Sequence, residues 1–169
     1  IAREIARKFN HHYGDVFIEP TEYIPEDVAI VPGTDGQKMS KSYNNTIPLF
    51  GTDAEIKKSV MSIVTDSAAP DEPKNPDENH IYNLYRLVAD NNKVQTMYDG
   101  FAEGGLGYGD AKKMLLEAIL ALVAPMRERR RYFEEHPQEV EAILTAGKEK
   151  VHAHIRPTME EVRKRVGLR

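Results

Sequence analysis

The sequence contains no cysteine, and this absence removes two classes of site. Disulfide frameworks need paired cysteines, and thiolate zinc sites need cysteine sulfur as a ligand. A cysteine-free chain suits a reducing compartment, so we expect a cytoplasmic protein. With 169 residues, the chain is long enough to bury a hydrophobic core without covalent cross-links.

Long apolar runs are also missing from the sequence. No stretch approaches the roughly 20 apolar residues that a membrane-spanning helix requires, so we expect no membrane contact. The first ten residues mix Arg, Glu and Lys with apolar residues and do not resemble a signal peptide. The chain begins at Ile1 rather than Met, and we interpret it as a fragment of a longer protein.

The first 50 residues have a mixed pattern. Apolar residues at helical spacing predict a helix over residues 1–10. Short β-branched or aromatic runs at residues 16–18 and 28–31 predict short strands or extended segments, and the Pro-Gly-Thr-Asp-Gly sequence at 32–36 predicts a loop. Residues 1–50 therefore have the pattern expected at the edge of an α/β domain.

From residue 51 onward the pattern is helical. The sequence Thr-Asp-Ala-Glu at 52–55 is a capping box, in which the first and last side chains satisfy free backbone amides. Apolar residues at helical spacing predict a helix over 77–92. A third helix is predicted from Asp110 as its N-cap, with a kink at Pro125, and a fourth from Pro137 at its first position. A second capping box at 158–161 predicts a short last helix that ends at Gly167. We predict an all-α helical bundle over residues 51–169 and a chain that is mostly helical overall.

The loop at 32–36 leads into the string Lys38-Met39-Ser40-Lys41-Ser42, which we call the signature string. Two lysines three residues apart on a mobile loop can both reach a polyphosphate, and the two serines add hydroxyl donors. If pyrophosphate leaves, ammonium groups stabilise the charge that develops on it. The alternative is an exposed loop with solvated lysines. The complete string arises by chance at roughly one window in several million, which favours the functional interpretation.

The signature string is the second signature of class I aminoacyl-tRNA synthetases, and the chain resembles that family. The wider stretch 31–47 closely resembles the bacterial tryptophanyl branch. Residues 105–109, followed by Lys112 and Lys113, resemble the turn into the family's long C-terminal helix, and residues 157–168 resemble its closing helix.

The resemblance implies a domain division and a reaction. Residues 1–50 would be the C-terminal part of a Rossmann-type catalytic domain with the signature loop, and residues 51–169 a helical anticodon-binding domain. The reaction would be ATP-dependent activation of L-tryptophan, with ATP as its Mg²⁺ complex, followed by transfer to tRNA(Trp). A homodimer is implied for the intact enzyme.

The resemblance also assigns roles within the signature string. Lys38 and Lys41 would contact the ATP phosphates during catalysis. Met39 would pack near the adenine, and Ser40 and Ser42 would support the loop, so that all five residues bind ATP.

The chain departs from the family in one large respect. The first signature, a His-x-Gly-His type element, does not occur in the sequence, so we expect the 169-residue chain to be inactive by itself. Two alternatives remain open: a fragment of a tyrosyl-tRNA synthetase, and a non-catalytic helical domain for RNA binding or protein interaction. A P-loop hydrolase is excluded because no G-x-x-x-x-G-K-[ST] string is present.

Histidines and basic residues give weaker signals. His11 and His12 are adjacent on a helix and point in different directions, so we expect no metal site there. The formal net charge is −4, so an RNA partner needs a local basic surface. Charge alone does not distinguish an RNA surface from a solvated helix face, and the resemblance favours RNA contact by some of the basic residues. The candidates are Arg127, Arg129, Arg130, Arg131, Lys148, Lys150, Arg163, Lys164 and Arg165.

Overall fold

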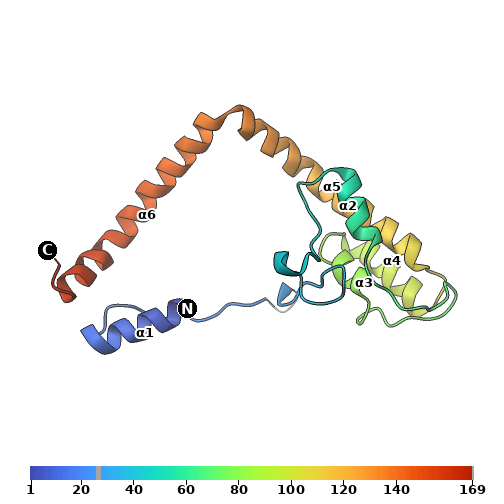
Figure 1. The fold of residues 1–169 in the computed structure, drawn as a ribbon, viewed down its shortest axis with the longest axis horizontal. Helices are drawn as coiled ribbons and strands as arrows, with labels where there is room; N and C mark the ends of the chain where they lie inside the picture. Colours follow the sequence, from blue (N-terminus) through green and yellow to red (C-terminus); the bar gives the residue numbers. More distant parts are fainter. Residues whose placement is uncertain (26–27, 169) are drawn as a thin grey trace. The chain divides into compact units, whose positions relative to one another are not determined.

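The structure is a computed structural model that describes residues 1–25 and 28–168. Its elements, in the order shown in Figure 1, are α1 (Ala2–Tyr13), the 3₁₀ turn η2 (Lys41–Tyr43), α2 (Asp53–Met61), α3 (His80–Tyr85), α4 (Asn91–Ala102), α5 (Tyr108–Glu135) and α6 (Pro137–Arg165). Contacts divide the chain into two compact units, one of residues 1–24 with 131–169 and one of residues 25–130. The chain is mostly helical, as predicted.

Of the two alternatives predicted for residues 16–18 and 28–31, the short strand is wrong. Residues 16–18 and 28–31 form no strand, and the described residues contain only an isolated antiparallel bridge between Pro32 and Lys38. The physical reason is that a β-branched run becomes a strand only when a second backbone pairs with it, and the described part of the chain supplies none. The described part of residues 1–50 therefore does not show the α/β edge that the sequence pattern predicted.

Side chains of α1 take up part of the hydrogen bonding that a neighbouring strand would provide. Asn10 Nδ2 donates to the carbonyl oxygen of Phe17 at 2.7 Å. Its Oδ1 accepts from the amides of Val16 at 3.1 Å and Phe17 at 3.0 Å. The predicted N-terminal helix is confirmed, and it holds the segment that follows through polar contacts instead of a β ladder.

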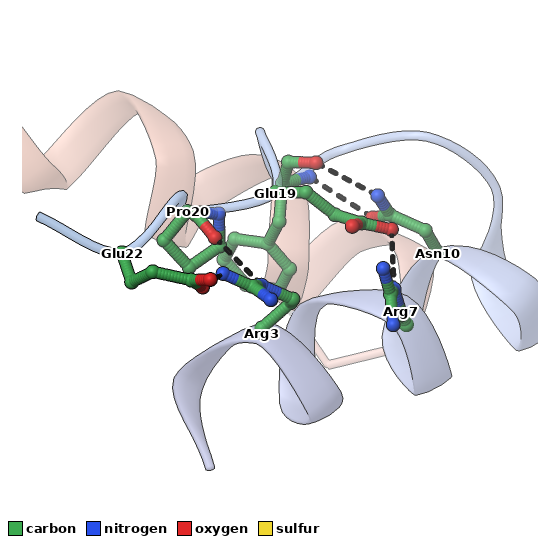
Figure 2. A network of polar contacts seen from close by, with 7 residues as sticks. Arg3, Arg7, Asn10, Glu19, Pro20 and Glu22 are labelled. Carbon is green, nitrogen blue, oxygen red and sulfur yellow. Dashed lines mark hydrogen bonds and ion pairs between the residues drawn. The ribbon is translucent and has the colours of Figure 1, made fainter.

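Two arginines of α1 extend this polar network (Figure 2). Arg7 Nε donates to Glu19 Oε1 at 2.8 Å, which lowers the pKa of that carboxyl. Arg3 Nε donates to the carbonyl oxygen of Pro20 at 3.0 Å and also pairs with Glu22. Solvent screens these exposed pairs, so they add little to the free energy of unfolding. Their effect is to hold residues 16–22 alongside α1.

The unit of residues 25–130 contains one hydrophobic core, built from α2, α3, α4 and the first part of α5 (Figure 1). The predicted capping box opens α2, with Glu55 N donating to Thr52 Oγ1 and Thr52 N donating to Glu55 Oε2. The buried core side chains are Ile56, Val60, Ile63, Ile81, Tyr82, Leu84, Tyr85, Met97, Phe101, Ala111, Leu115, Ile119 and Val123.

The helix predicted over residues 77–92 is wrong in length. Helix α3 contains only six residues, and a second helix, α4, follows it and was missed. Asp90 accepts a hydrogen bond from the amide of Lys93 and caps α4. A side chain that caps a new helix competes with continuation of the preceding one, which explains the break.

Both long C-terminal helices contain a proline. Helix α5 begins at Tyr108, so the predicted cap Asp110 lies inside its first turn, and the helix continues through Pro125. Helix α6 begins with Pro137 in its first turn, as predicted. The predicted separate helix from residue 158 is wrong, because α6 continues through Pro157. A capping box acts only where the preceding backbone is not helical, and here it is helical.

Helix α6 ends as predicted near Gly167. The amide of Leu168 bonds to the carbonyl of Arg163, and the amide of Gly167, at φ 78°, bonds to the carbonyl of Lys164. This pair of bonds is a Schellman motif, which favours glycine. None of the residues of α6 is buried, and Ile143, Leu144 and Val151 are all more than half exposed. The core of the predicted bundle is therefore made by α2–α5.

Among residues 1–25 and 28–168, no helix combines the length and the apolar character needed to cross a membrane.

Candidate functional site

Residues 31–45 form a compact loop, called the signature loop below. The amide of Met39 donates to the carbonyl of Val31 at 2.8 Å, and the amide of Gly33 donates to that of Gln37 at 2.6 Å. The chain reverses at Gly36, where φ is 81°, a value that glycine adopts without strain. The loop is thus a short hairpin that leads directly into the signature string.

The signature string ends in a tight turn. Ser40 caps the 3₁₀ turn η2, and its Oγ accepts from the amide of Ser42 at 3.2 Å. Asn44 follows in the left-handed conformation, with φ 53°. Lys38 and Lys41 are both exposed. The structure therefore presents the two predicted lysines to solvent from a backbone that is fixed by hydrogen bonds.

Asn45 lies beneath this loop and is only 2% exposed. Its Oδ1 accepts from the amide of Ser40 at 2.7 Å. Its Nδ2 donates to Asp35 Oδ1 at 2.7 Å and to the carbonyl of Lys38 at 3.2 Å. Its backbone oxygen accepts from the amide of Thr34 at 2.9 Å. No local sequence signal indicates a role for Asn45, because its burial depends on the folded loop.

The signature loop and the segment just after it are attached to the core of their unit. Val31 and Met39 of the loop, and Ile47 beyond its end, pack against the core cluster. Met39 is the residue that the family resemblance places near adenine, and in this structure it is half-buried against the core. The amide of Val64 also donates to the carbonyl of Thr34 at 2.8 Å, which ties the loop to the segment after α2.

That segment is in turn held by Lys112 of α5. Its Nζ donates to the carbonyl oxygens of Met61 at 3.0 Å and Ile63 at 2.6 Å. Burial lowers the pKa of Lys112, because a desolvated ammonium is less favourable. Lys112 thus supplies donors to the carbonyl end of α2, next to the point where Val64 holds the loop.

Asp35 and His80 complete the base of the loop. The hydrogen bond from Asn45 is the main cause that lowers the pKa of Asp35, and the amide of Gln37 and the nearby His80 act in the same direction. A Cβ atom at Gly36 would lie 2.4 Å from His80 Nε2, so α3 packs directly against the turn of the loop. The base is polar and ordered, while the lysines above it are exposed.

Some of the candidate basic residues form intramolecular contacts. Arg127 donates to Asp53 Oδ1 at 2.5 Å and also to the carbonyl of Gly51, so it braces the start of α2. Arg130 lies over the ring of Phe50 at 5.1 Å. In the other unit, Arg165 pairs with Glu161 at 2.6 Å. These three are weaker candidates for RNA contact than the remaining basic residues.

The remaining candidates are exposed side chains on α5 and α6. They are Arg129, Arg131, Lys148, Lys150, Arg163 and Lys164. His11 and His12 stack edge to face at 5.1 Å. The described residues contain no group of three or more side chains that could hold a metal ion.

Comparison with known proteins gives a consistent set of relatives. The family described as tRNA synthetases class I (W and Y) matches residues 1–124. The tryptophan–tRNA ligase of Fusobacterium nucleatum is 45% identical over 99% of this chain and 52% of that protein. The tryptophan–tRNA ligase of Rhodopirellula baltica is 40% identical over 100% of this chain and 53% of that protein.

A solved structure gives the same result. The tryptophanyl-tRNA synthetase of Campylobacter jejuni, complexed with ADP and tryptophan, has a TM-score of 0.77 and 36% identity, over 98% of this chain and 52% of that chain. The chain spans about half the length of these relatives. The family that the signature string indicated is confirmed, and this chain belongs to the class I tRNA synthetases of the W and Y group.

Proposed function

We propose that this chain is part of a tryptophan–tRNA ligase and that it supplies the ATP-phosphate loop and a helical tRNA-binding domain. In this proposal, residues 1–50 complete the edge of a Rossmann-type catalytic domain and residues 51–169 form the anticodon-binding domain. The intact enzyme is cytoplasmic and homodimeric. It activates L-tryptophan with ATP, as the Mg²⁺ complex, and transfers it to tRNA(Trp).

The observation that carries the proposal is the geometry of the signature loop. Lys38 and Lys41 are exposed on a backbone held by Asn45, Ser40 and the core contact of Met39. Cations on a preordered loop need little rearrangement when a substrate binds. Negative charge on the leaving pyrophosphate grows as its bond to the α-phosphate breaks, so fixed ammonium groups beside it stabilise the transition state more than bound ATP.

The test is Lys41→Ala in the full-length protein, with single-turnover adenylate formation as the assay. We expect the rate to fall on the order of a hundred- to a thousand-fold, the typical cost of removing one such donor. The dissociation constant of tryptophan should not change, since tryptophan carries no phosphate. Lys57→Ala, which removes an exposed lysine from α2, is the matched control and should keep the full rate.

Further variants resolve how the two lysines act. Lys38→Ala should behave as Lys41→Ala does, and the double variant should lose less than the product of the two effects if the pair acts as a unit. Lys41→Arg should rescue only partly, because a planar fork replaces a compact ammonium. An unchanged rate at saturating substrates, with only a raised dissociation constant for ATP, would limit the loop to nucleotide binding.

The amino-acid dependence of ATP–pyrophosphate exchange separates the competing functions. Exchange that requires tryptophan supports the proposal, whereas exchange that requires tyrosine supports a tyrosyl enzyme. A full-length protein without exchange would be a non-catalytic RNA-binding or interaction protein. The 169-residue chain alone is expected to show no exchange, because it lacks the first signature.

A further inference from the structure

Asn45 has an unusual position for a polar residue. It is one of the few fully buried side chains of the described residues that is not apolar, and both ends of its amide are used. A buried amide with all its hydrogen bonds made orders its surroundings, whereas one that loses a partner is costly. The environment of Asn45 is therefore specific for one arrangement of the signature loop.

The hydrogen bonds of Asn45 reach the backbone on both sides of Met39. The carbonyl of Lys38 accepts from Nδ2, and the amide of Ser40 donates to Oδ1. Lys41 follows Ser40 directly in the chain. One side chain thus fixes the backbone at the first lysine and immediately before the second.

Asn45 also holds the opposite side of the hairpin. Its Nδ2 donates to Asp35, and its backbone oxygen accepts from the amide of Thr34. Packing is tight, since a Cβ atom at Gly33 would lie 2.3 Å from Asn45 Nδ2. The side chain cannot shift toward Gly33, so its contacts set the distance between the turn of the loop and the signature string.

We propose that Asn45 is the positioning residue of the signature loop, and that, with Asp35 as its partner, it sets the place of the Lys38 and Lys41 ammonium groups relative to the phosphates of ATP. The inference rests on the proposed function for its effect on catalysis. A displacement of about 1 Å in a positioning group can reduce a rate about a hundredfold, so a polar contact beneath the loop can control chemistry above it.

The test uses Asn45→Asp in the full-length protein. This change keeps the shape but replaces the donor Nδ2 by an oxygen that faces Asp35 and the carbonyl of Lys38. We expect single-turnover adenylate formation to slow by about ten- to a hundredfold, with an unchanged dissociation constant for tryptophan. Asn44→Asp is the matched control, because it adds the same charge at the neighbouring exposed position and aspartate tolerates the left-handed conformation.

A second variant combines Asn45→Asp with Asp35→Asn. It restores the original charge and one hydrogen bond between the two side chains in the reverse direction. The rate should recover several-fold over Asn45→Asp, but not completely, because the carbonyl of Lys38 still faces an oxygen and the amide of Gln37 loses the Asp35 oxygen to which it donates. A double variant as slow as Asn45→Asp, or an Asn44→Asp variant that is equally slow, would overturn the proposal.

Hydrogen exchange gives a readout that does not depend on catalysis. In Asn45→Asp, the amides of Ser40 and Thr34 should exchange faster than in the unmodified full-length protein, while the amides of α4 keep their protection. If the unmodified protein shows no tryptophan-dependent exchange of pyrophosphate, the proposed function fails, and amide exchange still decides whether Asn45 orders the loop. Unchanged protection at Ser40 would overturn the positioning role.

Discussion

Replacing Lys112 by methionine is expected to destabilise the unit of residues 25–130 by about 2 kcal/mol. Lys112 Nζ donates to the carbonyls of Met61 and Ile63 at 3.0 and 2.6 Å. Methionine occupies a similar volume but carries no donor, so it leaves two carbonyl groups at the end of α2 without their partner. The change therefore tests the hydrogen bonds and not the packing.

The magnitude follows from two opposing effects. A hydrogen bond from a charged donor contributes about 1.5–3 kcal/mol, so two such bonds would contribute about 3–6 kcal/mol. Burial lowers the pKa of Lys112, which means that desolvation of the ammonium offsets part of that gain. A net loss of about 2 kcal/mol remains, equivalent to a fall of about 4–8 °C in Tm for a chain of this size.

The assay is urea and thermal unfolding of the 169-residue chain, followed by circular dichroism at the helical band. Lys113→Met is the matched control, because Lys113 is the next residue and forms an exposed pair with Asp110 at 2.8 Å. It should leave the free energy of unfolding nearly unchanged, because solvent screens an exposed pair. Equal stability of the two variants would refute the role of Lys112 as a brace between α5 and the end of α2.

Three further predictions concern individual contacts. Tyr108→Phe removes the hydrogen bond to Asp66 Oδ1 at 2.7 Å and, after a discount for solvent screening, should cost about 1 kcal/mol in urea unfolding. Burial and Asp66 raise the pKa of Tyr108 to about 12 from 10.0, so the native chain loses this stability as the pH rises from 10 toward 12. The Tyr108→Phe variant should lack that loss of stability. An equal loss in both proteins between pH 10 and 12 would contradict the prediction. The capping contacts with Thr52 lower the pKa of Glu55 from 4.5, so its stabilising effect is present above pH 4.5 and is lost as the pH falls below it. Glu55→Gln should therefore flatten the acid limb of the stability curve, and an acid limb as steep as that of the native chain would count against the capping role. Alanine at both Arg163 and Lys164 should weaken tRNA binding by the full-length protein and reduce its salt slope by about 2, measured by fluorescence anisotropy. Unchanged binding would remove this part of α6 from the RNA surface.

Helix starts with a local capping signal could be predicted from the sequence. Thr52 and Glu55 lie three residues apart, and Pro137 needs only a first-turn position, so these signals act within one turn. The same reasoning failed at residues 158–161, where the capping pattern lies inside α6, and at α4, where the cap by Asp90 was overlooked. A capping pattern allows a helix to begin, but the conformation of the preceding backbone determines whether one does.

The strand predictions failed for a different reason. The runs at residues 16–18 and 28–31 have suitable side chains, but a strand also needs a partner backbone, and a β-branched run does not contain one. Asn10 supplies hydrogen bonds to Val16 and Phe17 instead. The division into residues 1–50 and 51–169 describes the proposed functional domains and stays a prediction.

The sequence by itself determined the family, because the five residues Lys38–Ser42 are contiguous and their chemistry is local. It also determined the starts of α2 and α6, since a capping box and a first-turn proline each act within one turn. Only the tertiary structure decided how the lysines are presented. Asn45 is buried because a hairpin closes over it, and Lys112 reaches Met61 across 51 positions of the chain. Burial and long-range hydrogen bonds depend on which distant segments pack together, and no short pattern of residues encodes that packing.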